Sequence, residues 1–190
     1  MTDVRERMAD AAALLLARDG YQATSFTEVL ETSGAPRGSI YHHFPGGKDE
    51  LVSLALDRQA ARVIGGLDRL EGRTPGEVVE SFARWWRLGL EKSDFAVGCS
   101  LVAVTASAGA GALREEAGTL FERWIVRLAS LFEGAGVDAA VAASFAGELL
   151  AAVEGAVAIA RAQSSFAVFD RVVERLRAEA DALGGKGSDD

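Results

Sequence analysis

One stretch decides the fold of the N-terminal part of this chain: Gly34-Ala35-Pro36-Arg37-Gly38-Ser39-Ile40-Tyr41-His42-His43-Phe44. Glycine readily adopts the left-handed conformation that closes a helix, so Gly34 predicts the end of a preceding helix. Pro36 predicts the first turn of the next helix, where a missing N–H group does no harm. Ile40 and Phe44 have i, i+4 spacing and so form one apolar contact stripe. The stretch therefore predicts a tight turn followed by a short helix.

The residues before this stretch complete a three-helix unit. Residues 3–19 carry apolar side chains at helical spacing, and Gly20 follows them. Ser25 and Glu28 have capping-box spacing, which predicts the start of a second helix that ends at Gly34. Two short helices joined across a glycine turn and braced by a longer helix are typical of a helix-turn-helix unit. We place this predicted DNA-binding domain at residues 1–47.

The charge of the chain counts against a nucleic-acid binder, because the net charge is −8. Residues 1–50 also hold eight acidic side chains against five basic ones. Between Glu31 and Asp49, however, there is no acidic side chain. DNA binding would therefore depend on a local face of hydrogen-bond donors, with the acids pointing elsewhere, and it would depend strongly on salt.

The remainder of the chain also predicts helices. Alanine and leucine are abundant, prolines number three, and β-branched residues do not alternate with polar ones, which favours an all-α fold of about nine helices. Thr74-Pro75-Gly76-Glu77 combines a capping box with a proline at the first helical position. Beyond residue 47 we expect helices over 48–70, 75–92, 99–107, 112–133, 139–163 and 166–183. Residues 48–183 form the predicted C-terminal domain, and 184–190 a flexible tail.

Other classes of protein find little support in the sequence. The single cysteine, Cys99, has apolar neighbours and no histidine nearby, which favours a buried packing residue over a nucleophile. His42 and His43 are adjacent and point about 100° apart on a helix, so they do not suggest a shared metal ion. We expect no enzyme activity, no metal and no cofactor.

The sequence also predicts a cytoplasmic location. One cysteine excludes an intrachain disulfide, and the charged N-terminus lacks the apolar segment of a signal peptide. Glu148, Glu154 and Arg161 interrupt the most apolar run, so we expect no helix that spans a membrane.

Two segments of the first quarter of the chain resemble the N-terminal domain of TetR-family transcriptional regulators. They are Gly20-Tyr21-Gln22-Ala23-Thr24-Ser25 and Gly34 to Leu51, in which the glycines, Tyr41-His42-His43-Phe44 and Lys48 coincide with the family pattern. More weakly, Phe95-Ala96-Val97-Gly98-Cys99 and the region from Glu154 to Gln163 resemble the branch of lincomycin-resistance-type repressors.

The resemblance implies a homodimer whose paired third helices enter successive major grooves of a palindromic operator. It implies that Arg37, Gly38 and Ser39 face base edges. It also implies phosphate contacts for five residues, namely Thr27, Tyr41, His42, His43 and Lys48. The chemistry agrees, because a guanidinium can bind guanine O6 and N7 together, whereas Gly38 has no side chain and would permit close approach.

Two further sets of residues are candidates for ligand binding and dimerisation. Aromatic side chains at helical spacing either form core or line an apolar ligand cavity. The candidates for the cavity are Phe82, Trp85, Trp86, Phe121 and Trp124. Residues 139–162 are apolar nearly all round, so the chain and a two-fold partner would each bury one side. The candidates for this four-helix interface are Gly147, Leu150, Val153, Glu154, Val157, Phe169, Val172 and Leu176.

The sequence therefore predicts a DNA-binding transcriptional regulator, a repressor that a small apolar effector releases from double-stranded DNA. The alternative is a helical small-molecule-binding protein without DNA recognition, which the net negative charge of the N-terminal unit keeps open. An enzyme that uses Cys99 is a third class, but no general base, metal cluster or phosphate loop accompanies that cysteine.

Overall fold

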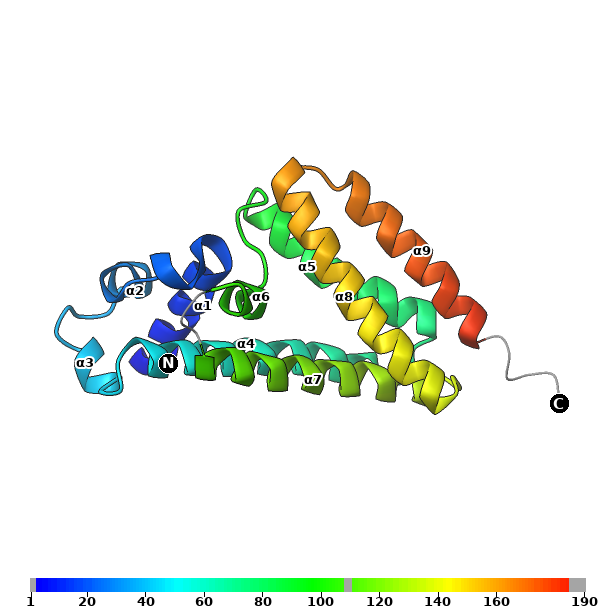
Figure 1. The fold of residues 1–190 in the computed structure, drawn as a ribbon, viewed down its shortest axis with the longest axis horizontal. Helices are drawn as coiled ribbons and strands as arrows, with labels where there is room; N and C mark the ends of the chain where they lie inside the picture. Colours follow the sequence, from blue (N-terminus) through cyan, green and yellow to red (C-terminus); the bar gives the residue numbers. More distant parts are fainter. Residues whose placement is uncertain (1–2, 108–110, 185–190) are drawn as a thin grey trace. The chain divides into compact units, whose positions relative to one another are not determined.

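The structure is a computed structural model that describes residues 3–107 and 111–184. Within these ranges the chain forms nine α-helices and one 3-10 turn and no strand, which confirms the all-α prediction (Figure 1). The helices are α1 Val4–Ala23, α2 Phe26–Ser33, α3 Ile40–His43, α4 Lys48–Leu67, α5 Pro75–Lys92, α6 Ser100–Thr105, α7 Gly111–Gly134, α8 Ala139–Gln163 and α9 Ala167–Gly184, and the 3-10 turn η1 is Asp68–Leu70. The predicted tail lies outside the described residues from 185 onward.

The chain divides into two compact units. The first comprises Met1–Arg62 and Cys99–Phe121, and the second comprises Val63–Gly98 and Glu122–Asp190. The long helices α4 and α7 each contribute residues to both units. The predicted boundary between the DNA-binding and C-terminal domains, after residue 47, falls inside the first unit. It remains a prediction of where the DNA-binding residues end.

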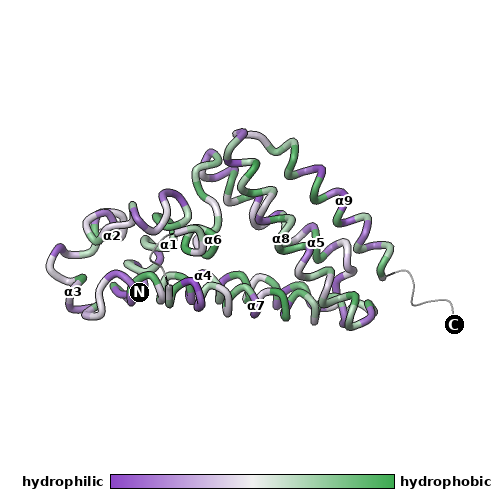
Figure 2. The backbone as a smooth tube through the Cα atoms, in the orientation of Figure 1, coloured by the Kyte–Doolittle hydropathy of each residue, from purple (hydrophilic) through white to green (hydrophobic). Residues whose placement is uncertain are grey.

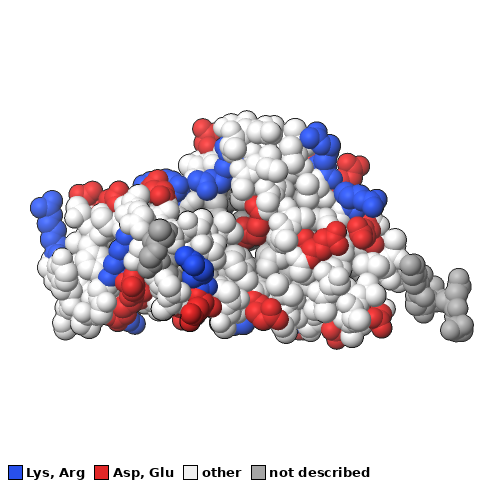
Figure 3. Space-filling model, in the orientation of Figure 1, with Lys and Arg blue, Asp and Glu red and all other residues white. Residues whose placement is uncertain are grey.

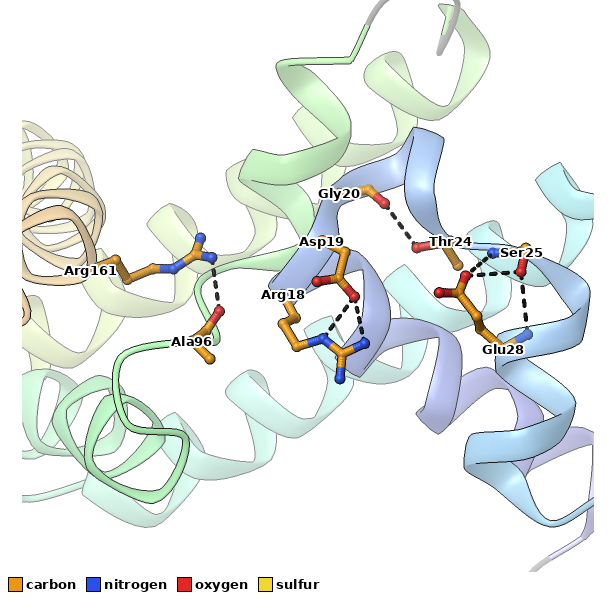
Figure 4. A network of polar contacts seen from close by, with 8 residues as sticks. All are labelled: Arg18, Asp19, Gly20, Thr24, Ser25, Glu28, Ala96 and Arg161. Atoms are coloured by element: carbon orange, nitrogen blue, oxygen red, sulfur yellow. Dashed lines mark hydrogen bonds and ion pairs between the residues drawn. The ribbon is translucent and has the colours of Figure 1, made fainter.

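In the first unit, α1 packs against α2 and α6. Its buried face includes Met8, Leu15 and Leu16, each at most 2% exposed. The predicted break at Gly20 is confirmed, because this residue has φ 83° and ψ 174° and interrupts the helix before its last turn. The hydroxyl of Thr24 donates to the Gly20 carbonyl over 2.9 Å and so fixes the turn that leads into α2 (Figure 4).

A charged cluster joins α1 to α4 in the first unit. The guanidinium of Arg58 donates to both carboxylate oxygens of Asp10, over 2.7 and 3.1 Å, and it also pairs with Glu6 over 3.0 Å. Arg62 pairs with the same carboxylate. Burial alone would raise the pKa of Asp10, but the hydrogen bonds and charges of the two arginines together lower it. The cluster therefore stabilises the packing of α4 on α1 when Asp10 is ionised.

In the second unit, α5, α8 and α9 pack against one another. Figure 2 shows hydrophobic and hydrophilic residues recurring along α5 and α9, as expected for helices with one buried face. The capping box at Thr74 and Glu77 and the proline at the first position of α5 are confirmed. The start of α8 is confirmed as well, because Asp138 accepts from the N–H groups of Ala140 and Val141.

The loop between α5 and α6 is held by α8 and by the turn that follows it. Arg161 donates to the Ala96 carbonyl over 2.8 Å (Figure 4). A Cβ atom at Gly98 would lie 2.7 Å from the same guanidinium, so only glycine fits there without a shift. The rings of Phe95 and Phe166 lie 4.7 Å apart between centroids. These contacts make the predicted loop an ordered part of the second unit.

The three charged residues of α8 do not make this helix too polar to span a membrane, contrary to the argument from the sequence. Ala139–Gln163 is long and apolar enough to cross a membrane by length and composition, despite Glu148, Glu154 and Arg161. A single helix of this kind is weak support for a membrane span, because a core helix of a soluble protein has the same composition. The packing of α8 against α5 and α9 accounts for its buried apolar residues, such as Phe145, Leu149 and Val153.

Replacing Asp10 by asparagine should lower the free energy of unfolding by about 1 kcal/mol near pH 7, because the ion pairs are partly exposed. The folded-state pKa of Asp10 is lowered, so this stabilisation is fully present above the ordinary value of about 3.9 and is lost as the pH falls below it. Urea unfolding of both proteins between pH 7 and pH 3 measures the effect. The difference should shrink in acid, whereas Asp57→Asn, an exposed change on α4, should alter little at any pH.

Candidate DNA-binding interface

Helix α2 has both of its predicted ends. The hydroxyl of Ser25 accepts from the N–H of Glu28 over 3.3 Å, and the Glu28 carboxylate accepts from the N–H of Ser25 over 3.1 Å (Figure 4). At the other end Gly34 has φ 65° and ψ 22°, and its N–H donates to the Leu30 carbonyl. The capping box and the glycine stop are therefore confirmed, and they set the angle at which the chain enters the next element.

The predicted start of α3 at Pro36 is wrong, because the helix begins at Ile40. Residues 36–39 form a turn in which both the N–H and the hydroxyl of Ser39 donate to the Pro36 carbonyl, over 3.0 and 2.7 Å. A serine hydroxyl that bonds nearby backbone competes with helix formation, and Gly38 has a low helix propensity. Arg37, Gly38 and Ser39 therefore lie in the turn before the helix.

The short α3 is held by buried anchors and by α1. Ile40 and Phe44 are both 0% exposed, as the i, i+4 spacing predicts. The guanidinium of Arg5 lies 5.1 Å from the centroid of the Phe44 ring and donates to the His43 carbonyl over 3.2 Å. Arg5 also pairs with Glu50 of α4 over 2.9 Å. These contacts fix the position of α3 relative to α1 and α4.

The predicted DNA-contacting residues lie in α2, in the turn before α3, in α3 and at the start of α4. Five of them are exposed, namely Thr27, Arg37, Gly38, Tyr41 and His42, and three are half-buried, namely Ser39, His43 and Lys48. Thr27, Arg37 and Tyr41 line one surface hollow between α2 and α3. The Tyr41 ring packs edge-on against Phe26, with 5.4 Å between centroids, and Tyr41 as a whole is 71% exposed.

Lys48 lies back against α1. Its amine donates to the Tyr21 carbonyl over 2.5 Å and lies 4.1 Å from the centroid of the Tyr21 ring, and burial lowers its pKa. Tyr21 in turn donates to Asp49, which together with burial raises the pKa of Tyr21 to about 12. An ammonium group has three N–H donors, so Lys48 keeps further donors for a phosphate beyond its bond to α1.

The acidic side chains of this region are mostly engaged in contacts. Six of the eight acids in residues 1–50 take part in ion pairs or hydrogen bonds, namely Glu6, Asp10, Asp19, Glu28, Asp49 and Glu50. On the face drawn in Figure 3, red and blue side chains lie beside each other at several places near the end labelled α3 in Figure 1. Because these acids are locally paired, the net negative charge of residues 1–50 argues less strongly against DNA binding.

One polar residue of the hollow was missed by the sequence-based list of site residues. Glu31 lines the hollow with Thr27, Arg37 and Tyr41, and within residues 3–107 and 111–184 its carboxylate makes no hydrogen bond or ion pair. The spacing from Thr27 to Glu31 is i, i+4, so the sequence places both on one face of α2. This spacing could have identified Glu31 as a candidate, but the sequence argument considered it only as the last acidic residue before the acid-free segment.

The predicted pocket aromatics belong to two different units. Phe82, Trp85 and Trp86 of α5 and Trp124 of α7 are in the second unit, and Phe121 is in the first. The Trp86 ring lies 6.4, 4.8 and 6.5 Å from those of Phe82, Trp85 and Trp124, between centroids. Trp86 is 5% exposed, and its indole N–H has no hydrogen-bond acceptor in the described part of the chain.

Most of the predicted interface residues are already covered within one chain. Leu150, Val153, Val157, Phe169 and Leu176 are each at most 5% exposed, and Gly147, Glu154 and Val172 are half-buried. The exposed stripe of α8 contains other residues at i, i+3 and i+4 spacing, namely Val141, Ser144, Glu148, Ala151, Gly155, Ala158, Ile159 and Ala162. Sequence periodicity indicated an apolar helix but did not tell which stripe the chain itself covers.

Cys99 is 6% exposed, in agreement with the prediction of a buried packing residue. Among the described residues, no group of three or more His, Cys, Asp or Glu side chains is arranged to hold a metal ion.

Comparisons with known sequences agree with this geometry. Residues 9–55 match the family model described as bacterial regulatory proteins, tetR family, and residues 75–175 match the transcriptional regulator LmrA/YxaF-like C-terminal domain. An uncharacterised HTH-type transcriptional regulator of Mycobacterium tuberculosis, Rv0196, is 35% identical over 184 residues, which is 93% of this chain and 94% of that protein. LmrA of Bacillus subtilis, an HTH-type transcriptional regulator, is 36% identical over 84 residues, or 43% of this chain and 45% of its own.

Solved structures share the fold. A TetR transcriptional regulator from Legionella pneumophila superposes with a TM-score of 0.82 at 20% identity, over 94% of this chain and 98% of that one. The regulatory protein TetR from Rhodobacter sphaeroides gives 0.80 at 20% identity, over 92% and 97%. The relatives are named as transcriptional regulators and not as enzymes. The chain thus belongs to the TetR family of bacterial transcriptional regulators, with a C-terminal domain of the LmrA/YxaF-like type.

Proposed function

We propose that this protein is a homodimeric repressor that binds a palindromic operator in the cytoplasm and is released by a small apolar effector. The observation that carries the proposal is the set of exposed polar side chains around the hollow between α2 and α3, next to the buried anchors Ile40 and Phe44. A relative supports the sign of regulation: KstR of Mycolicibacterium smegmatis, named a transcriptional repressor, is 36% identical over 73 residues, which is 37% of this chain and 35% of its own.

Arg37 is the proposed base-reading residue. It is exposed in the turn before α3, and its guanidinium makes no ion pair or hydrogen bond with any described residue. A guanidinium in the major groove can donate to guanine O6 and N7 at once, which discriminates that base from the others. Gly38 beside it has open space around its Cα, so the backbone there can approach the groove closely.

The proposed phosphate contacts surround this turn. Thr27 lies near the start of α2, where the helix dipole and hydroxyl both favour a phosphate. The other donors are Tyr41, His42, His43 and Lys48. Ser39 stays with the base-facing residues, because its hydroxyl already donates to the Pro36 carbonyl and keeps only acceptor capacity. Such contacts fix the register of the protein on the duplex but carry no sequence information of their own.

The exposed stripe of α8 is the proposed dimer interface. Val141 and Ile159 are 40% and 41% exposed although both are large apolar residues. Between them the stripe carries Ala151, Gly155 and Ala158, whose small side chains allow a second helix to approach closely. A two-fold copy of α8 and α9 would cover this stripe and form a four-helix interface. The same two-fold axis would relate the two α3 helices, and a palindromic operator has the same symmetry, with half-sites about 34–36 Å apart for helix-turn-helix dimers.

The aromatic residues of α5 support an apolar effector with a hydrogen-bond acceptor. An unpaired buried N–H group is rare and costs about 1–3 kcal/mol, so the indole N–H of Trp86 offers a donor to a ligand that reaches it. The neighbouring rings of Phe82, Trp85 and Trp124 would bind the apolar body of that ligand. The alternative of a small-molecule-binding protein without DNA recognition leaves the exposed donors around α3 without a role.

Changing Arg37 to alanine should weaken binding to the protein's own upstream DNA and reduce the preference for one base pair by about 1–3 kcal/mol. Fluorescence anisotropy with the operator and with single-base variants measures both effects. Arg84→Ala removes an exposed arginine of α5 and should leave the preference unchanged. Equal weakening on every sequence would make Arg37 a phosphate contact, and no binding by the wild type at low salt would reject the proposed function.

Changing Ile159 to glutamate should convert the dimer to a monomer, because it places a new charge on one of the two large apolar residues of the proposed two-fold contact. Size-exclusion chromatography with light scattering gives the mass directly. Val126→Glu is the matched control, since Val126 is 57% exposed on α7, and it should leave the mass unchanged. A folded wild-type monomer at micromolar concentration would contradict the proposed interface.

Apolar compounds with an acceptor should release the operator at lower concentration than compounds of the same shape without one. For a pair such as 2-acetylnaphthalene and 2-ethylnaphthalene, we expect a difference of about tenfold, the value of one hydrogen bond to a buried donor. Operator anisotropy and tryptophan fluorescence report the two events. The difference should vanish in Trp86→Phe but persist in Trp85→Phe, and equal potency of the two compounds on the wild type would contradict a role for the Trp86 N–H.

A further inference from the structure

The hollow between α2 and α3 has a volume of about 560 Å³ and two kinds of lining. Its apolar residues are Phe26, Leu30, Ala35 and Ile40, with Gly34 at the turn. Its polar residues are Thr27, Glu31, Arg37 and Tyr41. A hydroxyl, a carboxylate, a guanidinium and a phenol thus surround one small surface, and three of these groups are donors suited to DNA.

Glu31 does not fit a surface that only binds phosphates. Its side chain is exposed, it is the one acid that lines the hollow, and none of the described residues pairs with it. No ion pair joins it to Arg37, although both line the same hollow, so its negative charge is not neutralised by that cation. A carboxylate in this place repels the phosphate backbone unless it meets a hydrogen-bond donor on the DNA.

The major groove offers two amino donors, cytosine N4 and adenine N6, and cytosine suits a carboxylate better because adenine N6 lies beside the N7 acceptor. Cytosine presents its N4 amino group there, and glutamate is the side chain that accepts from it. Guanine O6 and thymine O4 present acceptors instead, and these would face the carboxylate with like partial charge. A carboxylate next to base edges can therefore select cytosine both by attraction and by rejecting other bases.

We propose that Glu31 is a second specificity-determining residue of this protein, which accepts a hydrogen bond from a cytosine N4 amino group while Arg37 binds a guanine. The inference rests on the proposed function, in which the turn before α3 lies in the major groove. The simpler alternative is a solvated surface charge that weakens binding to all DNA equally.

The test compares full-length wild-type protein with Glu31→Gln and Glu31→Ala by selection from a randomised DNA library, followed by affinity measurements on the selected sites. Glutamine has the same shape but binds adenine N6 and N7, so Glu31→Gln should change the preferred base from cytosine to adenine at one position of each half-site. Glu31→Ala should lose the preference there, with discrimination falling at least about tenfold. Asp57→Asn removes an exposed acid of the same unit and reports the general effect of one charge.

Each outcome decides the matter. Tighter binding of Glu31→Gln to every sequence, with unchanged preferences as in Asp57→Asn, would overturn the inference and leave the proposed function intact. Loss of binding to all sequences by both variants, with helix content retained in circular dichroism, would also overturn it. A wild-type protein that selects no sequence would reject the proposed function itself, and the selection separates that failure from the other two.

Discussion

The complete burial of Ile40 and Phe44 is the constraint on which the N-terminal structure depends. Helix α3 has four residues, and an isolated helix of that length has no stability in water. Its position is therefore set by the two buried side chains and by Arg5, which contacts Phe44, the His43 carbonyl and Glu50. These contacts therefore also determine where Arg37 and Gly38, exposed residues of the turn before α3, are placed. A rigid presentation of Arg37 follows from packing and not from helix propensity.

The same packing explains how an acidic chain can present a DNA-binding face. Glu6, Asp10 and Glu50 are paired with arginines that stabilise helix contacts, and Glu28 is used in the cap of α2. These acids stabilise helix contacts and the start of α2, and within the described residues they do not pair with the donors of the turn before α3. The bulk charge of −8 predicts weak non-specific attraction to DNA, and this leaves discrimination between sequences to a few directed contacts. The Glu31 carboxylate in the hollow would therefore contribute a larger share of the discrimination between DNA sequences than it would on a strongly basic surface.

The sequence predicted the parts of the fold that short-range chemistry determines. The capping boxes at Ser25 and Thr74, the stop at Gly34 and the cap at Asp138 all involve groups within four residues, so their geometry can be read from spacing. The start of α3 was not predictable in this way, because the hydroxyl of Ser39 closes a turn on Pro36 that competes with the helix. The stripe of α8 that stays exposed depends on where α5 and α9 pack, which periodicity does not encode. Glu31 was missed because its meaning depends on a hollow formed by residues from two helices.

Helix α4 connects the two units, since it is one continuous helix whose residues belong to both of them. At its start Lys48 contacts Tyr21, near its middle Arg58 and Arg62 bind Asp10, and its last turns belong to the second unit. The Asp10 cluster opposes any shift of α4 against α1, at a cost of about 1 kcal/mol. Under the proposed ligand response, an effector bound to the second unit would shift α4 only if it bound the shifted arrangement more tightly, by more than the free energy that this cluster contributes.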